Sequence, residues 1–403
     1  MPDRIRVLFA IGSLAGGGSE RQVVNILRHL DRSQFEPHLY LISRTGEFLC
    51  EVPDDVPVTA FDDQPDPSGM YLPGRIRRAQ IAHFASVLIN QNIEVVYDRT
   101  PHMTLIAGPA CETLNVPHLS TVVSNPVDDL NENIGRFRWL KYRILKRVYR
   151  NSSFVIANSR PLARACRDFY ELPVDLVTAL SNGFDFAEIN SLATENAASS
   201  DTLAGTFHIV AVGRLEECKG LDLLLNAVNE LVNVRGKTNL AVSIAGRGSC
   251  KAQLEHLTAQ NCLEQVVRFA GFQPNPYPLI RSADLYCLTS RYEGMPNVLV
   301  EAMSLGVPVL STDCPHGPRE ILEDGKLGML VPNLDVQSIA DGIEQAMKSD
   351  STREDRTVRA KESVLTRFGI GPTTQALETL LLKAAGRTSH ASNNSSADVR
   401  STP

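Results

Sequence analysis

Paired cysteines and long apolar runs are both missing from this 403-residue chain. Its eight cysteines are scattered and form no CxxC pair, which argues against a disulfide framework and against a zinc site. No stretch approaches 18 uninterrupted apolar residues, and the apolar run near the start covers only residues 7–11. A run of that length is too short for a membrane span or a signal peptide. These absences predict a cytoplasmic protein with reduced thiols.

Basic charge is not in excess either. The formal net charge is -6 and the pI is about 5.9, so the protein as a whole has no field that would attract nucleic acid. Contact with an anionic surface would therefore need a local basic patch. The 43% hydrophobic and 21% charged residues are ordinary for a soluble globular protein with sizeable cores.

Short apolar runs rich in β-branched residues alternate with amphipathic stretches along the chain. The runs predict buried parallel strands at residues 7–11, 37–43, 95–97, 118–123, 154–157, 207–213, 240–245, 266–270, 285–288 and 307–311. The amphipathic stretches predict helices at 20–30, 76–90, 140–150, 220–232, 251–260, 297–305, 336–347 and 353–385, the last with a break at Pro372. This alternation predicts an α/β protein whose parallel sheets carry helices on both faces.

A small, polar segment at residues 191–205 interrupts the alternation and predicts a linker. It would join two Rossmann-like domains, at residues 1–190 and 206–365, with a cleft at the carboxyl ends of their strands, where ligands bind. We expect a C-terminal helix at 366–387 to pack back on the N-terminal domain. The polar tail at 388–403 is expected to be disordered.

The strongest local signal is RYEGMPNVLVEAMSLGVPVLSTDCPHGPREIL at residues 291–322. Glu293 follows a predicted strand, and Glu301, after seven intervening residues, lies in the helix that Pro296 is suited to open. The first turn of a helix presents unpaired amides that favour a diphosphate, and carboxylates accept hydrogen bonds from sugar and ribose hydroxyls. Two glutamates alone would indicate only a surface helix with acids near its positive end.

Two cations precede that segment in AVGRLEECKG, residues 211–220. Arg214 follows a strand and Lys219 stands at the mouth of the next helix, so both could neutralise a diphosphate. Such stabilisation of a leaving group needs no metal. The acidic pair Asp128 and Asp129 is typical of a solvated turn, and we expect no metal cofactor. The alternative interpretation of Arg214 and Lys219 is a solvated turn before a helix.

Glycine turns follow three of the predicted strands. Gly16, Gly17 and Gly18 would let the backbone approach a ligand closely, although they match neither the GxGxxG nor the P-loop spacing. Gly246 lies in a second such turn, which a plain strand-to-helix connection explains nearly as well. Phe272 follows a glycine at the end of the next strand.

Together these motifs resemble the retaining GT-B glycosyltransferases of family 4, over most of the chain and most closely at residues 182–332. The resemblance implies that the N-terminal domain faces an acceptor, that Glu293 contacts the donor sugar and that Glu301 holds the ribose. It implies that Arg214 and Lys219 bind the leaving diphosphate, so that these two and Glu293 carry catalysis. The remaining donor contacts that it implies are Gly16, Gly17, Gly18, Gly246, Phe272, Met295, Pro296, Asn297 and Val298. The nucleotide sugar is then a substrate and not a cofactor.

The acceptor side is less defined. Many members of the family have a histidine after the fourth strand, whereas LSTVVSNPVDD at residues 119–129 has none and offers Asn125. His102 is a nearby alternative, although a lone loop histidine is more often a bystander. The STDCPHGPREIL run is most similar to members that build lipid-linked oligosaccharides or surface polysaccharides.

A basic and aromatic run, GRFRWLKYRILKRVYR at residues 135–150, has no acidic residue and contains Trp139, the only tryptophan. Cations beside aromatic side chains suit an anionic membrane surface. The residues expected at the membrane are Arg136, Arg138, Trp139, Lys141, Arg143, Lys146 and Arg147. The alternative is a domain helix with a solvated basic face.

The sequence therefore predicts a metal-independent, retaining glycosyltransferase that moves a sugar from a nucleotide donor to a lipid-linked or polysaccharide acceptor at the inner face of the cell membrane. Two other functions fit the same scaffold, because a fold does not fix a function. One is a nucleotide-sugar epimerase or hydrolase. The other is a non-catalytic nucleotide-sugar-binding protein of a glycan assembly complex.

Overall fold

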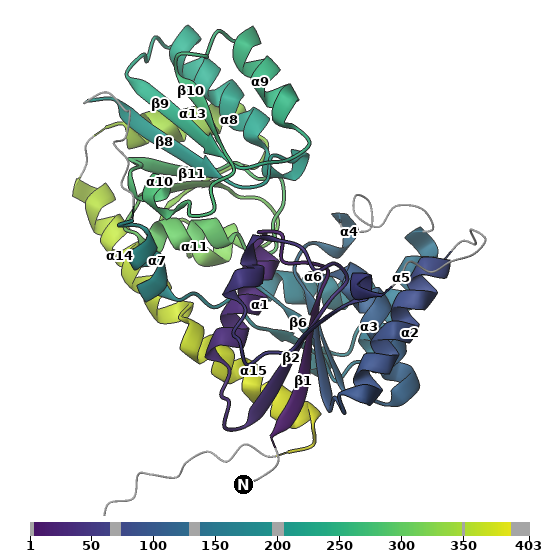
Figure 1. Ribbon diagram of the computed structural model, residues 1–403. Helices are drawn as coiled ribbons and strands as arrows, with labels where there is room; N and C mark the ends of the chain where they lie inside the picture. The colour runs from purple at the N-terminus through teal and green to yellow at the C-terminus, as the bar shows by residue number, and fades with distance from the viewer. Residues whose placement is uncertain (1–3, 65–73, 129–137, 196–204, 349–350, 388–403) are drawn as a thin grey trace, which may run out of the picture.

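The structure, a computed structural model, describes residues 4–64, 74–128, 138–195, 205–348 and 351–387. The chain forms two lobes, each an α/β domain built on a parallel sheet (Figure 1). Most of the predicted linker, at 196–204, and the predicted tail, at 388–403, lie outside the described residues.

The N-terminal domain has a seven-stranded parallel sheet in the order β3-β2-β1-β4-β5-β6-β7. Its strands are β1 (Ile5–Ile11), β2 (Phe35–Leu41), β3 (Val58–Ala60), β4 (Val95–Arg99), β5 (His118–Val122), β6 (Phe154–Ala157) and β7 (Val177–Ala179). Its longer helices are α1 (Gly18–His29), α2 (Arg75–Asn90), α3 (Pro101–Leu114), α5 (Arg138–Asn151) and α6 (Arg160–Tyr170). Leu8 and Phe9 of β1 are both buried, on opposite faces, because helices cover both sides of the sheet.

The C-terminal domain has a six-stranded parallel sheet in the order β10-β9-β8-β11-β12-β13. Its strands are β8 (Phe207–Val212), β9 (Leu240–Ala245), β10 (Val267–Gly271), β11 (Leu285–Leu288), β12 (Val309–Thr312) and β13 (Met329–Val331). The helices include α7 (Phe186–Leu192), α8 (Leu221–Asn229), α9 (Lys251–Gln260), α10 (Tyr277–Arg281), α11 (Asn297–Ser304), α12 (Pro318–Ile321) and α13 (Val336–Ala346). The predicted α/β architecture with two parallel sheets is confirmed.

The last two helices, α14 (Ser351–Arg367) and α15 (Ile370–Ala384), run from the upper lobe down along the lower one (Figure 1). On α15, Leu377 and Leu381 are buried in the core of the N-terminal domain. The predicted break at Pro372 is wrong, because the two helices separate at residues 368–369. Pro372 lies in the first turn of α15, where a missing N–H costs no helical hydrogen bond.

Strands β3, β7 and β13 and helices α3 and α6 were not predicted. Each of the three strands has only three residues and lies at a sheet edge, where packing with the neighbouring strand stabilises it more than its own pattern does. Helix α3 begins at Pro101 and contains Pro109, and its mostly buried surface gives no amphipathic period.

Candidate active site

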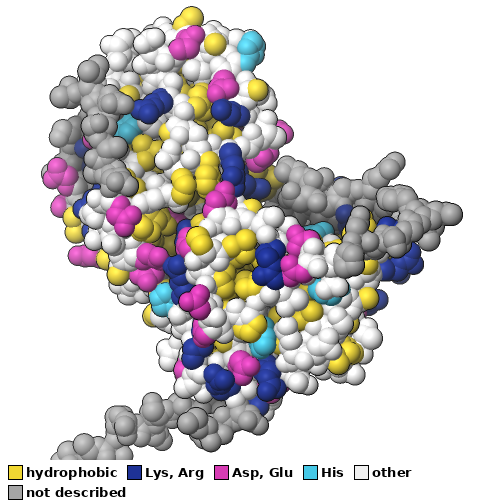
Figure 2. All heavy atoms as spheres, in the orientation of Figure 1, with side chains coloured by type: hydrophobic (Ala, Val, Ile, Leu, Met, Phe, Trp, Pro, Cys, Tyr) yellow, Lys and Arg dark blue, Asp and Glu magenta, His cyan; other side chains and the backbone are white. Residues whose placement is uncertain are grey.

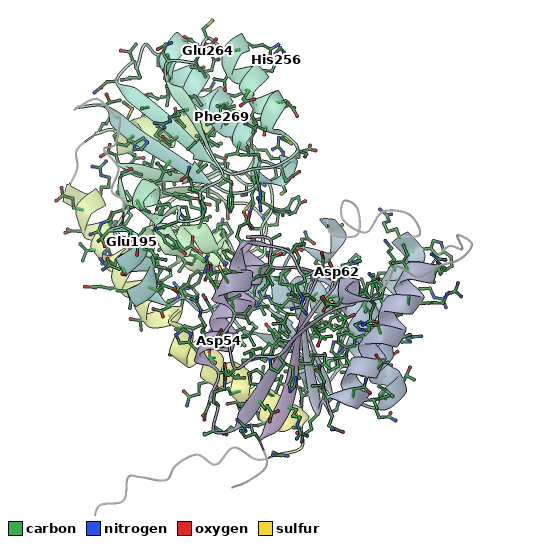
Figure 3. The ribbon with its side chains drawn as sticks, in the orientation of Figure 1. Asp54, Asp62, Glu195, His256, Glu264 and Phe269 are labelled. Atoms are coloured by element: carbon green, nitrogen blue, oxygen red, sulfur yellow. The ribbon has the colours of Figure 1, made fainter. Side chains whose placement is uncertain are left out.

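The candidate site lies at the junction of the two domains, beside the carboxyl ends of β8 and β11. These strands are neighbours in the sheet, so the loops that follow them meet. The loop after β8 carries Arg214 and Lys219, and the loop after β11 carries Glu293. At the other end of this domain, remote from the junction, lie His256 and Glu264 (Figure 3).

Glu293 is buried and tightly bound at this junction. Its Oε1 accepts hydrogen bonds from Lys219 Nζ at 2.6 Å and from Ser290 Oγ at 2.6 Å. The ion pair with Lys219 is only partly open to solvent, with 21% of the lysine and 9% of the glutamate side chain exposed. Gly220 has a φ of +58°, and a Cβ there would meet the carbonyl oxygen of Thr289 at 2.1 Å. The glycine therefore lets the lysine loop lie against the strand end that carries Glu293.

Helix α11 begins directly after this glutamate, with Pro296 at its N-cap. The amides of Asn297 and Val298 in its first turn have no carbonyl of the preceding turn to bind, and they point out of the helix end. Met295 is buried, and its sulfur accepts a hydrogen bond from the Asn182 amide at 3.3 Å. The predicted donor-contact residues 295–298 thus form one turn beside Glu293.

Glu301 lies one turn further along α11. It is also buried, but at a different place from Glu293. It lines a small cavity between the domains with Arg21 and Asn25 of α1, Tyr277, Phe184 and the helix α7. Burial raises the pKa of Glu301 to about 7, and the charge of Arg21 opposes that shift. The cavity has room for about one water (≈ 10 Å³), so a ribose could enter it only if the domains moved apart.

Arg214 is exposed at the end of β8. Its charge lowers the pKa of Glu216, after the stronger effect of Ser249, and it opposes the raising of the Glu20 pKa by burial. Arg214 thus stands on the same side of the junction as Lys219 but outside the Lys219–Glu293 pair.

The glycine turn at Gly16 to Gly18 contacts the C-terminal domain. A Cβ on Gly16 would lie 3.4 Å from the Phe272 ring, and the Gly18 carbonyl accepts a 3.4 Å hydrogen bond from Asn297 Nδ2. The N-terminal turn therefore lies against two of the predicted donor-contact residues of the other domain.

A second contact across the junction is made by Arg247, next to Gly246. Its guanidinium donates to the Ala15 carbonyl at 2.7 Å, pairs with Glu47 at 2.9 Å and lies 4.3 Å from the centre of the Phe272 ring. We call this group the Arg247 clasp. Gly246 itself cannot carry a side chain, because a Cβ there would lie 1.8 Å from the Gly213 carbonyl.

The segment that enters the second domain joins both halves of the site. Asn182 donates to Asn297 Oδ1 at 2.7 Å and accepts from Arg99 at 2.9 Å, and Gly183 exchanges two hydrogen bonds with Gln22. The buried Asn182 therefore connects the end of β4 with the first turn of α11.

The predicted acceptor-side residues lie at the carboxyl ends of neighbouring strands. His102 is in the first turn of α3, after β4, and Asn125 follows β5 and caps the amide of Val127 at 3.1 Å. Burial, and then the charges of Lys141 and Arg77, lower the pKa of His102. His102 is thus close to two cations, and the side chains at this edge belong to α2, α3 and α5.

Helix α5 carries most of the predicted membrane-surface residues, of which Arg136 lies outside the described residues. Trp139 is 63% exposed and Leu140 is 41% exposed, whereas Leu145 and Val148 face the core. Lys146 pairs with Glu171 at 2.7 Å and Arg147 pairs with Glu112 at 3.0 Å. Figure 2 shows Lys and Arg side chains at the right-hand edge of the lower lobe, on the side of α2 and α5. No described helix has the length and apolar content to cross a bilayer.

Sequence reasoning missed several residues that the junction brings together: Glu20, Arg99, Arg247 and Ser290. A signal was available for Glu20, since it follows the glycine turn within GGGSER. Arg247 had none, because its partner Ala15 is 232 residues away in the chain. The contact that brings Arg99 to the junction, with Asn182, spans 83 residues.

Comparison with known proteins gives matches over nearly the whole chain. The family model "Glycosyltransferase Family 4" matches residues 16–188, and the model "Glycosyl transferases group 1" matches residues 194–363. A Campylobacter jejuni N-acetylgalactosamine-N,N'-diacetylbacillosaminyl-diphospho-undecaprenol 4-alpha-N-acetylgalactosaminyltransferase is 25% identical over 87% of this chain and 92% of its own. The putative colanic acid biosynthesis glycosyltransferase WcaL of Salmonella typhimurium is 34% identical, over 43% of this chain and 44% of its own length.

Solved structures agree on the fold. Anabaena Alr3699/HepE in complex with UDP and glucose superposes with a TM-score of 0.79, at 22% identity, over 94% of this chain and 100% of its own. A sucrose-phosphate synthase from Thermosynechococcus elongatus gives 0.77 at 15% identity, over 94% of this chain and 99% of its own. With two matching family models and this fold, the chain belongs to the GT-B glycosyltransferases of the family 4 type.

Proposed function

We propose that this glycosyltransferase moves a sugar from a nucleotide-sugar donor to a lipid-linked or polysaccharide acceptor, with retention of configuration and without a metal ion. The observation that carries the proposal is the meeting of Lys219, Glu293 and the first turn of α11 at one point of the domain junction. A cation, a carboxylate and free helix-end amides are the groups that a diphosphate-linked sugar needs.

The cations would act on the leaving group. As the bond between the sugar C1 and the phosphate oxygen breaks, negative charge grows on the diphosphate, and Lys219, Arg214 and the α11 amides would stabilise it. Glu293, held by Lys219 and Ser290, would accept hydrogen bonds from the sugar hydroxyls, and Glu301 from the ribose. Lys219 and Arg214 would supply the positive charge that a metal ion gives in other transferases.

Without a covalent intermediate, retention requires that the acceptor hydroxyl attacks C1 from the same face from which the leaving group departs. A new bond then forms between the acceptor oxygen and C1, and the hydroxyl proton passes to the departing phosphate oxygen. We assign no covalent nucleophile. His102 and Asn125, on the N-terminal side of the junction, are proposed to contact the acceptor.

The acceptor class is inferred from relatives. The Campylobacter protein is named for transfer to a diphospho-undecaprenol glycan, and WcaL for colanic acid biosynthesis. A lipid-linked acceptor would place the enzyme at a membrane surface, and the exposed Trp139 and Leu140 beside basic residues of α5 support such contact.

The function is tested by incubating the purified protein with membrane lipid extract and a panel of radiolabelled nucleotide sugars. We expect one donor to label the lipid fraction, nucleotide release to depend on the extract, and transfer to persist in excess EDTA. NMR of the product should show the anomeric configuration of the donor. Release of nucleotide without acceptor would favour a hydrolase, and an isomerised donor would favour an epimerase.

Membrane contact is tested separately by sedimentation with vesicles of anionic and of neutral lipid. We expect the protein to sediment with anionic vesicles at low salt, and the W139A/L140A double variant to stay in the supernatant. V234A is the matched control, because Val234 is also 68% exposed and belongs to the other domain. Equal sedimentation of all three proteins would contradict the membrane part of the proposal.

A further inference from the structure

Arg99 is a buried cation at the domain junction to which the proposed mechanism gives no task. It stands at the end of β4 and is 3% exposed. Its Nη1 donates to the Tyr97 hydroxyl at 3.1 Å and its Nη2 donates to Asn182 Oδ1 at 2.9 Å, and both partners are neutral. Among the residues that the structure describes, Arg99 forms no ion pair, and its Nε has no hydrogen-bond partner. A buried charge without a counter-ion destabilises a fold, which points to a functional role for this arginine.

A chain of hydrogen bonds leads from Arg99 across the junction. Asn182, which accepts from Arg99, donates through its Nδ2 to Asn297 Oδ1 at 2.7 Å. Asn297 Nδ2 in turn donates to the Gly18 carbonyl at 3.4 Å. A Cβ on Gly18 would lie 2.9 Å from Asn297 Nδ2, so the glycine leaves room for this amide group. The chain therefore joins the buried arginine to the first turn of α11 and to the glycine turn.

Arg99 fixes the direction of this chain. A side-chain amide has an oxygen that accepts and an NH2 group that donates, and by itself it can present either end to a neighbour. A guanidinium has donors only, so Asn182 must turn its oxygen toward Arg99 and its NH2 group toward Asn297. Asn297 then accepts with its oxygen. Its own NH2 group faces the glycine turn, where Gly18 takes one of the two N–H bonds.

We propose that Arg99 and Asn182 are positioning residues of the donor site: they hold the Asn297 side chain so that its second N–H donates to an oxygen of the donor diphosphate. The inference rests on the proposed function, which places the diphosphate at the first turn of α11. In the opposite orientation the Asn297 oxygen would face the anion and the Gly18 carbonyl, and both would repel it. The donor-only head of the chain excludes that orientation.

The test is isothermal titration calorimetry at one fixed pH with UDP, GDP, UDP-glucose and GDP-mannose, which all carry a diphosphate. N297A should raise the Kd of the nucleotides that the wild type binds about 10-fold, because a hydrogen bond to a charged group is lost. N182D should raise the Kd at least as much, because a carboxylate only accepts and so turns the NH2 group of Asn297 toward itself. When N182D is added to N297A, it should cost nothing further.

The N182D variant also separates positioning from a purely structural role. It gives the buried Arg99 a counter-ion, so its thermal midpoint should equal or exceed that of the wild type while binding is weakened. N190D is the matched control, because Asn190 accepts from Arg281 at 3.4 Å at an exposed site. This control adds the same charge beside an arginine and should leave the Kd unchanged.

A second pair of variants tests Arg99 itself and does not depend on the folding of N182D. R99K keeps a head that only donates, whereas R99M has no donor. R99K should leave the Kd within about 2-fold of the wild type, and R99M should raise it about 5-fold. Equal Kd values for the two variants would overturn the role of Arg99.

Three further results would contradict the inference. An unchanged Kd in N182D, or an additional loss when N182D is combined with N297A, would overturn it and leave the donor proposal intact. A loss in N297A that appears with UDP-glucose but not with UDP would overturn the assignment to the diphosphate. Failure of the wild type to bind any of the four probes would overturn both the inference and the proposed donor.

Discussion

The two sides of the domain junction are built differently. On the C-terminal side, which we call the donor lip, Lys219, Glu293 and Ser290 are mostly buried and share hydrogen bonds of 2.6 Å. On the N-terminal side, the acceptor lip, His102 and Asn125 share no hydrogen bond among the described residues, and burial, followed by the charges of Lys141 and Arg77, lowers the pKa of His102.

On the proposed function, this difference explains how one scaffold can keep its chemistry and change its acceptor. Groups that hold a diphosphate must be placed before the substrate arrives, so they are fixed by burial and mutual bonds. Groups that select an acceptor lie on helix starts and loops, which tolerate change. Substitutions in the donor lip should therefore reduce activity far more than substitutions in the acceptor lip.

The largest effect is expected from G294A. A Cβ at this position would lie 1.9 Å from the Val123 carbonyl of the opposite domain, so the methyl group would hold the lips apart. Displacement of about 1 Å at a reacting centre costs about 100-fold, and we expect kcat/KM to fall by at least that factor. G371A is the control, since a Cβ there has no atom within 4 Å. Equal activity of the two variants would contradict the close contact of the lips.

E301Q should have opposite effects on stability and on binding. Burial raises the pKa of Glu301 from 4.5 to about 7, so its contribution to stability is present below about pH 4.5 and is lost as the pH rises through 7. At pH 8 the ionised Glu301 should lower the free energy of unfolding by about 3 kcal/mol. E301Q should therefore melt at a higher temperature than the wild type at pH 8 but not at pH 4.5.

The same variant should bind the donor about 10-fold more weakly, because an amide accepts hydrogen bonds from a ribose less well than a carboxylate. Both effects can be followed by thermal melts with and without nucleotide sugar. If E301Q were less stable than the wild type at pH 8, burial would not destabilise the ionised form of Glu301.

R247A should have a smaller effect. The Arg247 clasp is partly open to solvent, and such ion pairs contribute little, so we expect kcat to stay within about 3-fold of the wild type and KM for the donor to rise by a similar factor. K251A is the control, because within the described part of the chain Lys251 pairs with Glu255 of its own helix and with no other acid. A large loss of kcat in R247A would show that the clasp takes part in the chemical step.

The smallest effect is expected from H102Q at the acceptor lip. We expect transfer to fall no more than about 3-fold, which corresponds to about 0.65 kcal/mol, near the low end of what one hydrogen bond contributes. The pH profile of transfer should be unchanged, as the lowered pKa of His102 keeps it neutral near pH 7. A loss of 100-fold or a shifted profile would make His102 a general base and remove the contrast between the lips.

Much of the donor lip could be predicted from the sequence, because its residues belong to loops that follow strands of one parallel sheet. Lys219 and Glu293 each follow a strand that local hydrophobicity identifies, and neighbouring strands bring them together. Across the junction the same reasoning fails. Arg247 depends on a contact with a segment far away in the chain, which only the packing of the two domains decides.

The central claim is that Lys219 and Glu293 act as one unit on the donor. It is tested most directly by kcat/KM of K219M, E293Q and the double variant, with K237M as an exposed control lysine. We expect each single change to cost about 100-fold, K237M to cost nothing and the double variant to be little worse than the worse single one. Costs that multiply in the double variant, or full activity of K219M, would contradict it.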